Sequence, residues 1–256
     1  MEYGRVQMID RGDGVRLATR FLPGRGPTLL FLPGYMSDMA GSKAEHLLAF
    51  AVRTGRQCLL LDYSGCGRSE GRFDDGSIRR WAADALAMAD RLAPGPLLPV
   101  GSSMGGWAML HLALADPARV HALVGVAAAP DFTRWGLALD DGERRALRQQ
   151  GFFTRPSPYA DSPYRYSRAF LEDAETAALL DGDIPLDCPV RLLHGTEDEE
   201  VPTGVSARLM AALRSTDVQL TLVKGGDHRL SSPSALALLE RTIESAIESA
   251  IESLAP

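Results

Sequence analysis

The sequence predicts an α/β fold, with a mostly parallel twisted sheet, helices on both faces and a small lid insertion. Short apolar runs alternate with stretches of helical periodicity along the chain, which is the pattern of strands joined by crossover helices. The 256 residues are 45% hydrophobic, enough for one large core, so we expect a single domain over residues 1–256. Within it, the connection 131–185 is much longer than a usual crossover and is expected to form the insertion.

Seven short apolar runs are predicted as strands because turn residues bound each of them. In chain order they are residues 17–21, 29–32, 58–62, 97–100, 123–127, 190–193 and 218–222. The segments between them have helical patterns, in which Trp81 and Trp107 are expected to pack in the core rather than against a cofactor. Near the end of the chain, the spacing of Ile243, Ile247 and Ile251 predicts a helix whose apolar stripe docks on the sheet, with a dimer contact as the alternative.

One serine lies at the turn between a predicted strand and the helix that follows it. The pentapeptide Gly101-Ser102-Ser103-Met104-Gly105 comes after the apolar run 97–100 and opens a helical stretch. A G-x-S-x-G motif in this context is typical of a nucleophile elbow, whose tight turn strains the serine backbone and needs glycine on either side. Ser103 is therefore the predicted nucleophile, and an ordinary glycine-rich turn is the alternative.

A serine hydroxyl is a weak nucleophile, so this prediction requires a base and a group that orients the base. His228 follows the predicted strand 218–222 in a glycine-rich turn, and Asp198 follows the strand 190–193. The chain order serine, acid, base is one of the orders found in catalytic triads. Asp131, just after the strand 123–127, is a second candidate for the acid, whereas Glu197, Glu199 and Glu200 are interpreted as a solvated acidic loop.

The chain has only five histidines, which narrows the choice of base. Structural roles are expected for the four that lie in helical patterns or at strand ends, namely His46, His111, His121 and His194. His194 in particular ends a predicted strand and is expected to satisfy a local hydrogen bond. His228 is thus the predicted base.

Hydrolysis through a serine also needs two backbone N–H groups directed at the oxyanion that forms. One is expected to be the N–H of Met104, which follows the nucleophile. The other is expected from Tyr35, in the loop Pro33-Gly34-Tyr35 after the predicted strand 29–32, where Gly34 permits close approach. A plain β-turn is the alternative for this loop.

Taken together, these segments resemble the α/β-hydrolase superfamily over nearly the whole chain. The resemblance is carried by residues 33–35, 61–69, 101–107, 191–195 and 227–229. Within the superfamily, the chain is similar to the mitochondrial palmitoyl-protein thioesterases that also hydrolyse acyl glucuronides, although Pro33 stands where many superfamily members have histidine. The resemblance implies a serine hydrolase of the carboxylesterase or thioesterase type with Ser103, Asp198 and His228 as its triad.

Charge and cysteine content restrict the setting in which the protein works. The formal net charge of −6, with scattered lysines and arginines, argues against nucleic acid and anionic membrane as partners. Cys58, Cys66 and Cys188 are odd in number and form no C-x-x-C pair, which favours free thiols in a reducing compartment. The first residues lack the apolar region of a secretory signal, and no run reaches membrane-spanning length, so we expect a cytoplasmic location.

The insertion 131–185 is rich in aromatic residues and arginines. Above the strand ends it would cover Ser103 and hold an apolar group. Together with this, the resemblance to the thioesterases implies a small-molecule or acylated-protein ester or thioester as the substrate. The sequence calls for no cofactor and no metal, and leaves monomer and dimer open. Lactonase or carbon–carbon bond hydrolase activity on the same triad remains an alternative, as does a catalytically silent ligand-binding protein of the same fold.

Overall fold

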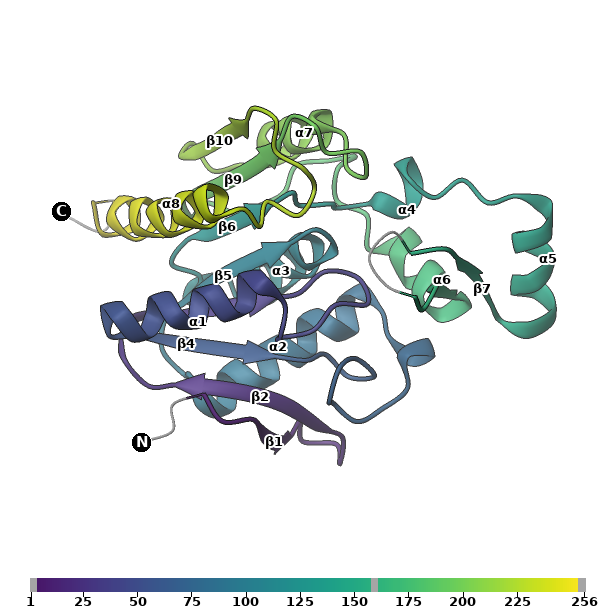
Figure 1. The fold of residues 1–256 in the computed structure, drawn as a ribbon, viewed down its shortest axis with the longest axis horizontal. Helices are drawn as coiled ribbons and strands as arrows, with labels where there is room; N and C mark the ends of the chain where they lie inside the picture. The colour runs from purple at the N-terminus through teal and green to yellow at the C-terminus, as the bar shows by residue number, and fades with distance from the viewer. Residues whose placement is uncertain (1–3, 158–160, 253–256) are drawn as a thin grey trace.

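The computed structural model describes residues 4–157 and 161–252 of the chain. Its frame is an eight-stranded sheet in the order β1-β2-β4-β3-β5-β6-β9-β10 (Figure 1), and a separate two-stranded sheet pairs β7 with β8. The strands are β1 Gln7–Asp10, β2 Arg16–Leu22, β3 Arg25–Leu32, β4 Arg56–Leu61, β5 Leu97–Ser102, β6 Leu123–Val126, β7 Phe152–Arg155, β8 Tyr164–Ser167, β9 Val190–Gly195 and β10 Val218–Val223. All neighbours from β4 to β10 in this order pair in parallel, and β2 pairs antiparallel with both β1 and β4. The predicted mostly parallel sheet is confirmed.

Helices cover both faces of this sheet. They are α1 Ser42–Thr54, α2 Ile78–Leu92, α3 Met104–Ala115, α4 Phe132–Trp135, α5 Asp141–Gln150, α6 Arg168–Thr176, α7 Thr203–Ala212 and α8 Pro233–Glu252, with 3₁₀ turns η1 Phe73–Asp75 and η2 Pro117–Arg119. In Figure 1, α1 and α8 lie on the face turned to the viewer, and α2 and α3 lie behind the sheet. No helix in the described ranges is both long and apolar enough to cross a membrane.

Alternate residues of the central strands point to opposite faces and supply two cores. In β3, Leu29 and Phe31 pack in the core that contains α1 and α8, whereas Leu30 and Leu32 pack in the core that contains α2 and α3. A strand buried on both faces must be apolar on both, which is why these strands read in the sequence as continuous apolar runs.

The last helix departs in part from its prediction. Ile243 and Ile247 are buried in the core against the sheet, but Ile251 is 59% exposed. The buried face of α8 is therefore continued in its last turn by Ala250, which is 2% exposed, rather than by Ile251.

The segment between β6 and β9 contains α4, α5, the β7–β8 hairpin and α6. In Figure 1 these elements lie together beyond the ends to which β4 and β9 point, which are the carboxyl ends of the parallel strands. A capping box starts α5: Asp140 Oδ1 accepts from the N–H of Glu143 (2.8 Å), and Glu143 Oε2 accepts from the N–H of Asp140 (2.9 Å). The hairpin was not predicted from the sequence.

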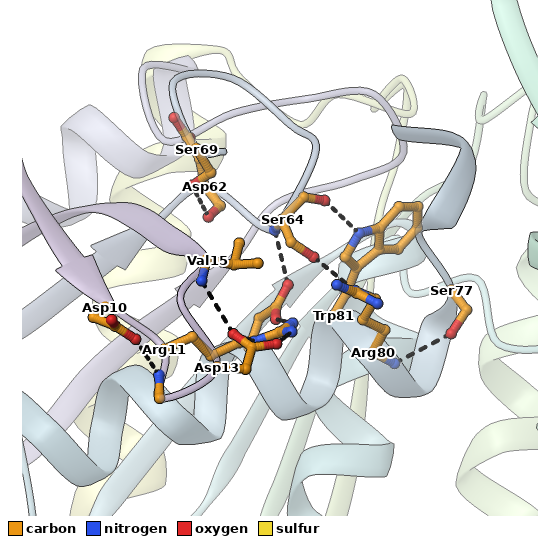
Figure 2. A network of polar contacts seen from close by, with 12 residues as sticks. Asp10, Arg11, Asp13, Val15, Asp62, Ser64, Ser69, Ser77, Arg80 and Trp81 are labelled. Carbon is orange, nitrogen blue, oxygen red and sulfur yellow. Dashed lines mark hydrogen bonds and ion pairs between the residues drawn. The ribbon is translucent and has the colours of Figure 1, made fainter. Parts of the chain in front are cut away.

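A buried polar network fixes the loop that follows β4. Asp84 of α2 is fully buried and accepts hydrogen bonds from Arg11 Nη1 (2.6 Å) and from the N–H of Ser64 (2.8 Å). Figure 2 shows Ser64 at the centre of these contacts, where its carbonyl also accepts from Trp81 Nε1 (3.2 Å) and its hydroxyl from Arg80 Nε (3.2 Å). One buried carboxylate thus joins the β1–β2 turn, the loop after β4 and α2.

We expect Asp84→Asn to lower the free energy of unfolding by about 2 kcal/mol, since it removes the charged acceptor from the hydrogen bonds of Arg11 and Ser64. Asp13→Asn is the matched control, because Asp13 also pairs with Arg11 but its side chain is 50% exposed. Urea unfolding of both variants measures the difference. Equal shifts of the two urea unfolding midpoints would contradict the expectation that the buried carboxylate of Asp84 contributes more to stability than the exposed carboxylate of Asp13.

Candidate active site

Ser103 lies at the sharp turn between β5 and α3, with a φ of 55° that places it in the left-handed region disfavoured for residues with a side chain. The flanking glycines are required by close backbone contacts. A Cβ on Gly101 would lie 2.6 Å from the carbonyl oxygen of Gly105, and a Cβ on Gly105 would lie 2.1 Å from that of Leu32. The G-x-S-x-G motif therefore forms the strained turn expected of it.

The structure brings His228 and Asp198 to Ser103. His228 Nε2 lies 3.1 Å from Ser103 Oγ, and His228 Nδ1 lies 2.8 Å from Asp198 Oδ2. The three residues follow β5, β9 and β10, whose carboxyl ends meet at the same edge of the parallel sheet. The loops after β9 and β10 are in contact, since the N–H of Glu197 donates to the carbonyl of Gly226 at 2.9 Å.

The Asp198 side chain is fully shielded from solvent and is surrounded by donors. Its Oδ1 accepts from the backbone N–H groups of Glu200 (2.9 Å) and Val201 (2.8 Å), and its Oδ2 lies 3.2 Å from His194 Nε2 as well as 2.8 Å from His228. Burial alone would raise the pKa of this carboxyl, but the hydrogen bonds from the two histidines and from Val201 outweigh burial and hold the pKa well below its usual range. Asp198 is therefore a carboxylate at neutral pH.

The second candidate acid, Asp131, has other partners. It is buried, and its carboxylate accepts hydrogen bonds from the N–H groups of Leu179 (2.9 and 3.0 Å) and Leu180 (2.7 Å). These contacts hold the stretch after α6 against the end of β6. The hydrogen bonds of Asp131 thus have a structural role, whereas the carboxylate of Asp198 contacts His228.

The acidic loop after β9 was interpreted as solvated, and Glu197, Glu199 and Glu200 are indeed exposed, but two of them also face the site. Glu199 and Glu200 line the cavity that contains Ser103, and Glu200 Oε2 lies 3.7 Å from His228 Nε2. Partial burial raises the pKa of Glu200, and the nearby His228 opposes that rise. The sequence could not show this, because a run of acidic residues looks the same whether it faces solvent or a cavity.

The loop after β3 lies against the serine. A Cβ on Gly34 would be 3.4 Å from Ser103 Cβ and 4.0 Å from Ser103 Oγ, and both Tyr35 and Met104 line the same cavity as Ser103. The phenol of Tyr35, for which the sequence suggested no role, donates a hydrogen bond to the backbone carbonyl of Arg165 in β8 (2.5 Å). Its ring stacks on Tyr166 with centroids 5.1 Å apart and planes 9° apart.

The cavity around Ser103 has a volume of about 790 Å³. Aromatic and apolar side chains, many of them from the segment between β6 and β9, make up much of its lining: Tyr35, Phe132, Trp135, Leu137, Tyr164 and Tyr166. Lys43 and Arg155 also line it, but burial lowers the pKa of Lys43 to about 8, and Arg155 is paired with Glu143 through contacts of 2.7 and 2.9 Å. Among the residues that the structure describes, no group of three or more potential metal-ligating side chains is found.

The comparisons with known proteins agree on one family. Residues 29–238 match the model of the alpha/beta hydrolase family. A human protein named palmitoyl-protein thioesterase ABHD10, mitochondrial, is 38% identical over 245 residues, which cover 93% of this chain and 79% of that protein. The mouse protein of the same name is 39% identical over 242 residues, covering 93% and 81%.

Solved structures give the same result. A putative hydrolase from Agrobacterium vitis has a TM-score of 0.88 at 37% identity, covering 95% of this chain and 98% of that one. The mouse alpha/beta hydrolase domain-containing protein 10 has a TM-score of 0.87 at 38% identity, covering 96% and 99%. Est1E from Butyrivibrio proteoclasticus with bound ferulic acid shares the fold, with a TM-score of 0.78 at 20% identity and coverage of 96% and 99%.

The cytoplasmic location predicted from the sequence is contradicted by these relatives, since the human and mouse proteins are named as mitochondrial. The prediction depended on the lack of an apolar secretory region and on unpaired cysteines. The first observation bears only on secretion, and free thiols are not specific to the cytoplasm, so neither separates that compartment from a mitochondrial one.

Proposed function

Because the chain belongs to the alpha/beta hydrolase family, we propose that it is a serine hydrolase that cleaves carboxylic ester or thioester bonds of apolar acyl groups through an acyl-serine intermediate. The family membership confirms the resemblance seen in the sequence. One observation carries the proposal: the hydrogen-bonded chain from Ser103 Oγ through His228 to Asp198, with contacts of 3.1 and 2.8 Å, opens on a cavity rich in aromatic side chains. The names of the human and mouse relatives support a thioester among the substrates.

In the first half-reaction, His228 Nε2 accepts the Ser103 hydroxyl proton as Oγ attacks the acyl carbonyl. The tetrahedral intermediate collapses when the bond to the leaving sulfur or oxygen breaks, and the imidazolium returns its proton to that atom. Asp198 remains a carboxylate throughout, accepts the Nδ1–H of His228 and thereby keeps Nε2 free to take a proton. In the second half-reaction, His228 Nε2 accepts a proton from water as the water oxygen attacks the acyl carbonyl. The bond to Ser103 Oγ then breaks, the imidazolium returns the proton to Oγ, and the carboxylic acid is released.

The backbone N–H groups of Tyr35 and Met104 are the proposed oxyanion donors. The proximity of Gly34 to Ser103 supports this assignment, because a loop that approaches the nucleophile so closely can place the next N–H beside the reacting carbonyl. Met104 begins α3, so its N–H also belongs to the positive end of a helix dipole.

The same proposal treats the chain as one domain in which residues 131–185 form a lid. Its support is the lining of the cavity, to which Phe132, Trp135, Leu137, Tyr164 and Tyr166 from this segment contribute. Aromatic walls next to Ser103 suit an apolar acyl group, because burial of each methylene contributes about 0.8 kcal/mol of binding.

We expect Ser103→Ala to lower kcat about 10⁴- to 10⁶-fold, since the other residues of a triad cannot act without the nucleophile. Intact-mass analysis after treatment with a fluorophosphonate measures the assignment directly, with one adduct expected on Ser103. Ser102→Ala is the matched control, because it changes the neighbouring hydroxyl of the motif and should leave labelling intact. An adduct on any other residue would refute the assignment.

Activity should decline on acidification, because the His228 imidazole must be neutral to accept the serine proton. Asp198 will not cause this loss: despite burial, its hydrogen bonds hold its pKa well below the usual range, so the carboxylate stays charged in weak acid.

We expect Asp198→Asn to keep the fold and lower kcat about 10⁴-fold. Asp131→Asn is the control and should affect stability only; if instead it abolished kcat while Asp198→Asn did not, the acid would be Asp131.

The specificity constant kcat/KM should rise with acyl length about fourfold per methylene until the apolar lining is filled. A series of p-nitrophenyl esters and acyl-CoA thioesters from two carbons upward, with Ser103→Ala as blank, measures this. Trp135→Ala enlarges the cavity and should move the optimum to longer chains, whereas Ile251→Ala, at an exposed site on α8, should not. If Ser103 is labelled but no member of the series is hydrolysed, the enzyme cleaves another bond; if neither occurs, the silent binding protein is the better explanation.

A further inference from the structure

A second histidine contacts the carboxylate that holds His228. His194 lies in β9 and its side chain is completely buried. Its Nε2 is 3.2 Å from Asp198 Oδ2 and 2.8 Å from the carbonyl oxygen of Val201, and its Nδ1 is 2.6 Å from Ser206 Oγ in α7. The sequence predicted only a local hydrogen bond for this residue, and the contact with Asp198 is the part that it missed.

These contacts define where the ring hydrogen of His194 lies. The carbonyl of Val201 can only accept, so Nε2 must carry a hydrogen, which then also points toward the nearby Asp198 Oδ2. Nδ1 is left to accept from the Ser206 hydroxyl. The buried ring is therefore held at both nitrogens in one orientation, with Nε2 bonded to the Val201 carbonyl and 3.2 Å from the Asp198 carboxylate.

The contact completes the environment of Asp198. Oδ1 accepts from two backbone N–H groups, and Oδ2 faces the ring nitrogens of His194 and His228. A carboxylate with all of these donors cannot rotate without losing several at once. Burial of Asp198 disfavours its charged form, and the contacts from His194 and His228 both favour that form.

We propose that His194 is a positioning residue of the catalytic centre, which holds the Asp198 carboxylate charged and oriented so that Oδ2 meets His228 Nδ1. The inference depends on the proposed function, because the orientation of Asp198 matters only if His228 is the base for Ser103. Its action is indirect, since His194 is not itself part of the cavity lining and its printed polar partners do not include Ser103. Ser206 supports it by fixing the tautomer.

Two polar substitutions separate this role from simple core packing. The amide nitrogen of His194→Gln falls near the position of Nε2 and can still donate to Asp198, whereas that of His194→Asn falls near Nδ1 and cannot. We expect the Gln variant to keep most of its kcat and the Asn variant to lose about 10- to 100-fold, the rate equivalent of one hydrogen bond to a charged group. KM should stay the same in both, because His194 does not contact the substrate cavity.

The decisive measurement is a double-mutant cycle with Asp198→Asn. If His194 acts through the carboxylate, His194→Asn should change the residual kcat less than about twofold in the Asp198→Asn background. His111→Asn is the matched control: His111 also donates from Nε2 to a buried backbone carbonyl, that of Ala177 (2.8 Å), but is not linked to Asp198, so loss of this donor should leave kcat unchanged in either background. Thermal unfolding of each variant verifies that it is folded.

The rate at which a fluorophosphonate labels Ser103 gives a readout that does not depend on the natural substrate. It should fall with His194→Asn in parallel with kcat. An equal loss of kcat in the His194→Gln and His194→Asn variants, or the same fold-loss of kcat with and without Asp198→Asn, would overturn the proposal.

If His194→Asn does not fold, Ser206→Ala replaces it in the same cycle. Its kcat is expected to fall about 3- to 10-fold because the Nε2–H donor is weakened. An unchanged kcat in this variant would overturn the proposal. Failure of wild-type Ser103 to label would instead count against the proposed function itself.

Discussion

The backbone of Ser103 is held in a conformation that residues with a side chain avoid, and the neighbouring backbone keeps it there. Its N–H donates to the carbonyl of Val126 (2.9 Å), and its own carbonyl accepts from the N–H groups of Gly106 (2.9 Å) and Ala129 (3.0 Å). Two of these partners belong to the end of β6 and the residues just after it. The strained turn is therefore stabilised by the register of β5 on β6, so the position of the serine depends on the sheet as a whole.

This dependence explains why the proposed reacting groups could be located from the sequence. Each follows a strand of the parallel sheet. β5 and β9 are buried along their whole length and give a clear apolar signal, whereas the edge strand β10 is marked by alternating apolar residues. Ser103 and His228 also lie in glycine-containing turns, where the chain must approach other backbone closely. In contrast, β1 was missed, because it is an edge strand of mixed character with most of its side chains exposed, and β7 and β8 are four residues each and pair only with one another.

The partners of the reacting groups depend on tertiary contacts that no local pattern records. His194 lies opposite Leu222 in the register of β9 on β10, and only the full packing places its ring beside Asp198 rather than deeper in the core. Likewise Arg165 reaches Asp74, 91 residues away, through contacts of 2.5 and 2.7 Å. The sequence could therefore identify the insertion and its aromatic content, but not the residues by which it is attached.

Tyr35 illustrates how such an attachment bears on the chemistry. Its backbone is the proposed oxyanion donor, while its phenol donates to the Arg165 carbonyl of β8. The N–H of Arg165 in turn contacts Met36 Sδ at 3.2 Å, so both backbone groups of this hairpin residue meet the loop after β3. The ring of Tyr35 also packs against six aromatic side chains: Phe73, Trp81, Phe132, Tyr164, Tyr166 and Phe170. A movement of the hairpin away from the sheet would expose this cluster and leave the phenol without its acceptor. The wall of the cavity around Ser103 and the loop proposed to stabilise the oxyanion are therefore parts of one packed unit, and their geometry is maintained together.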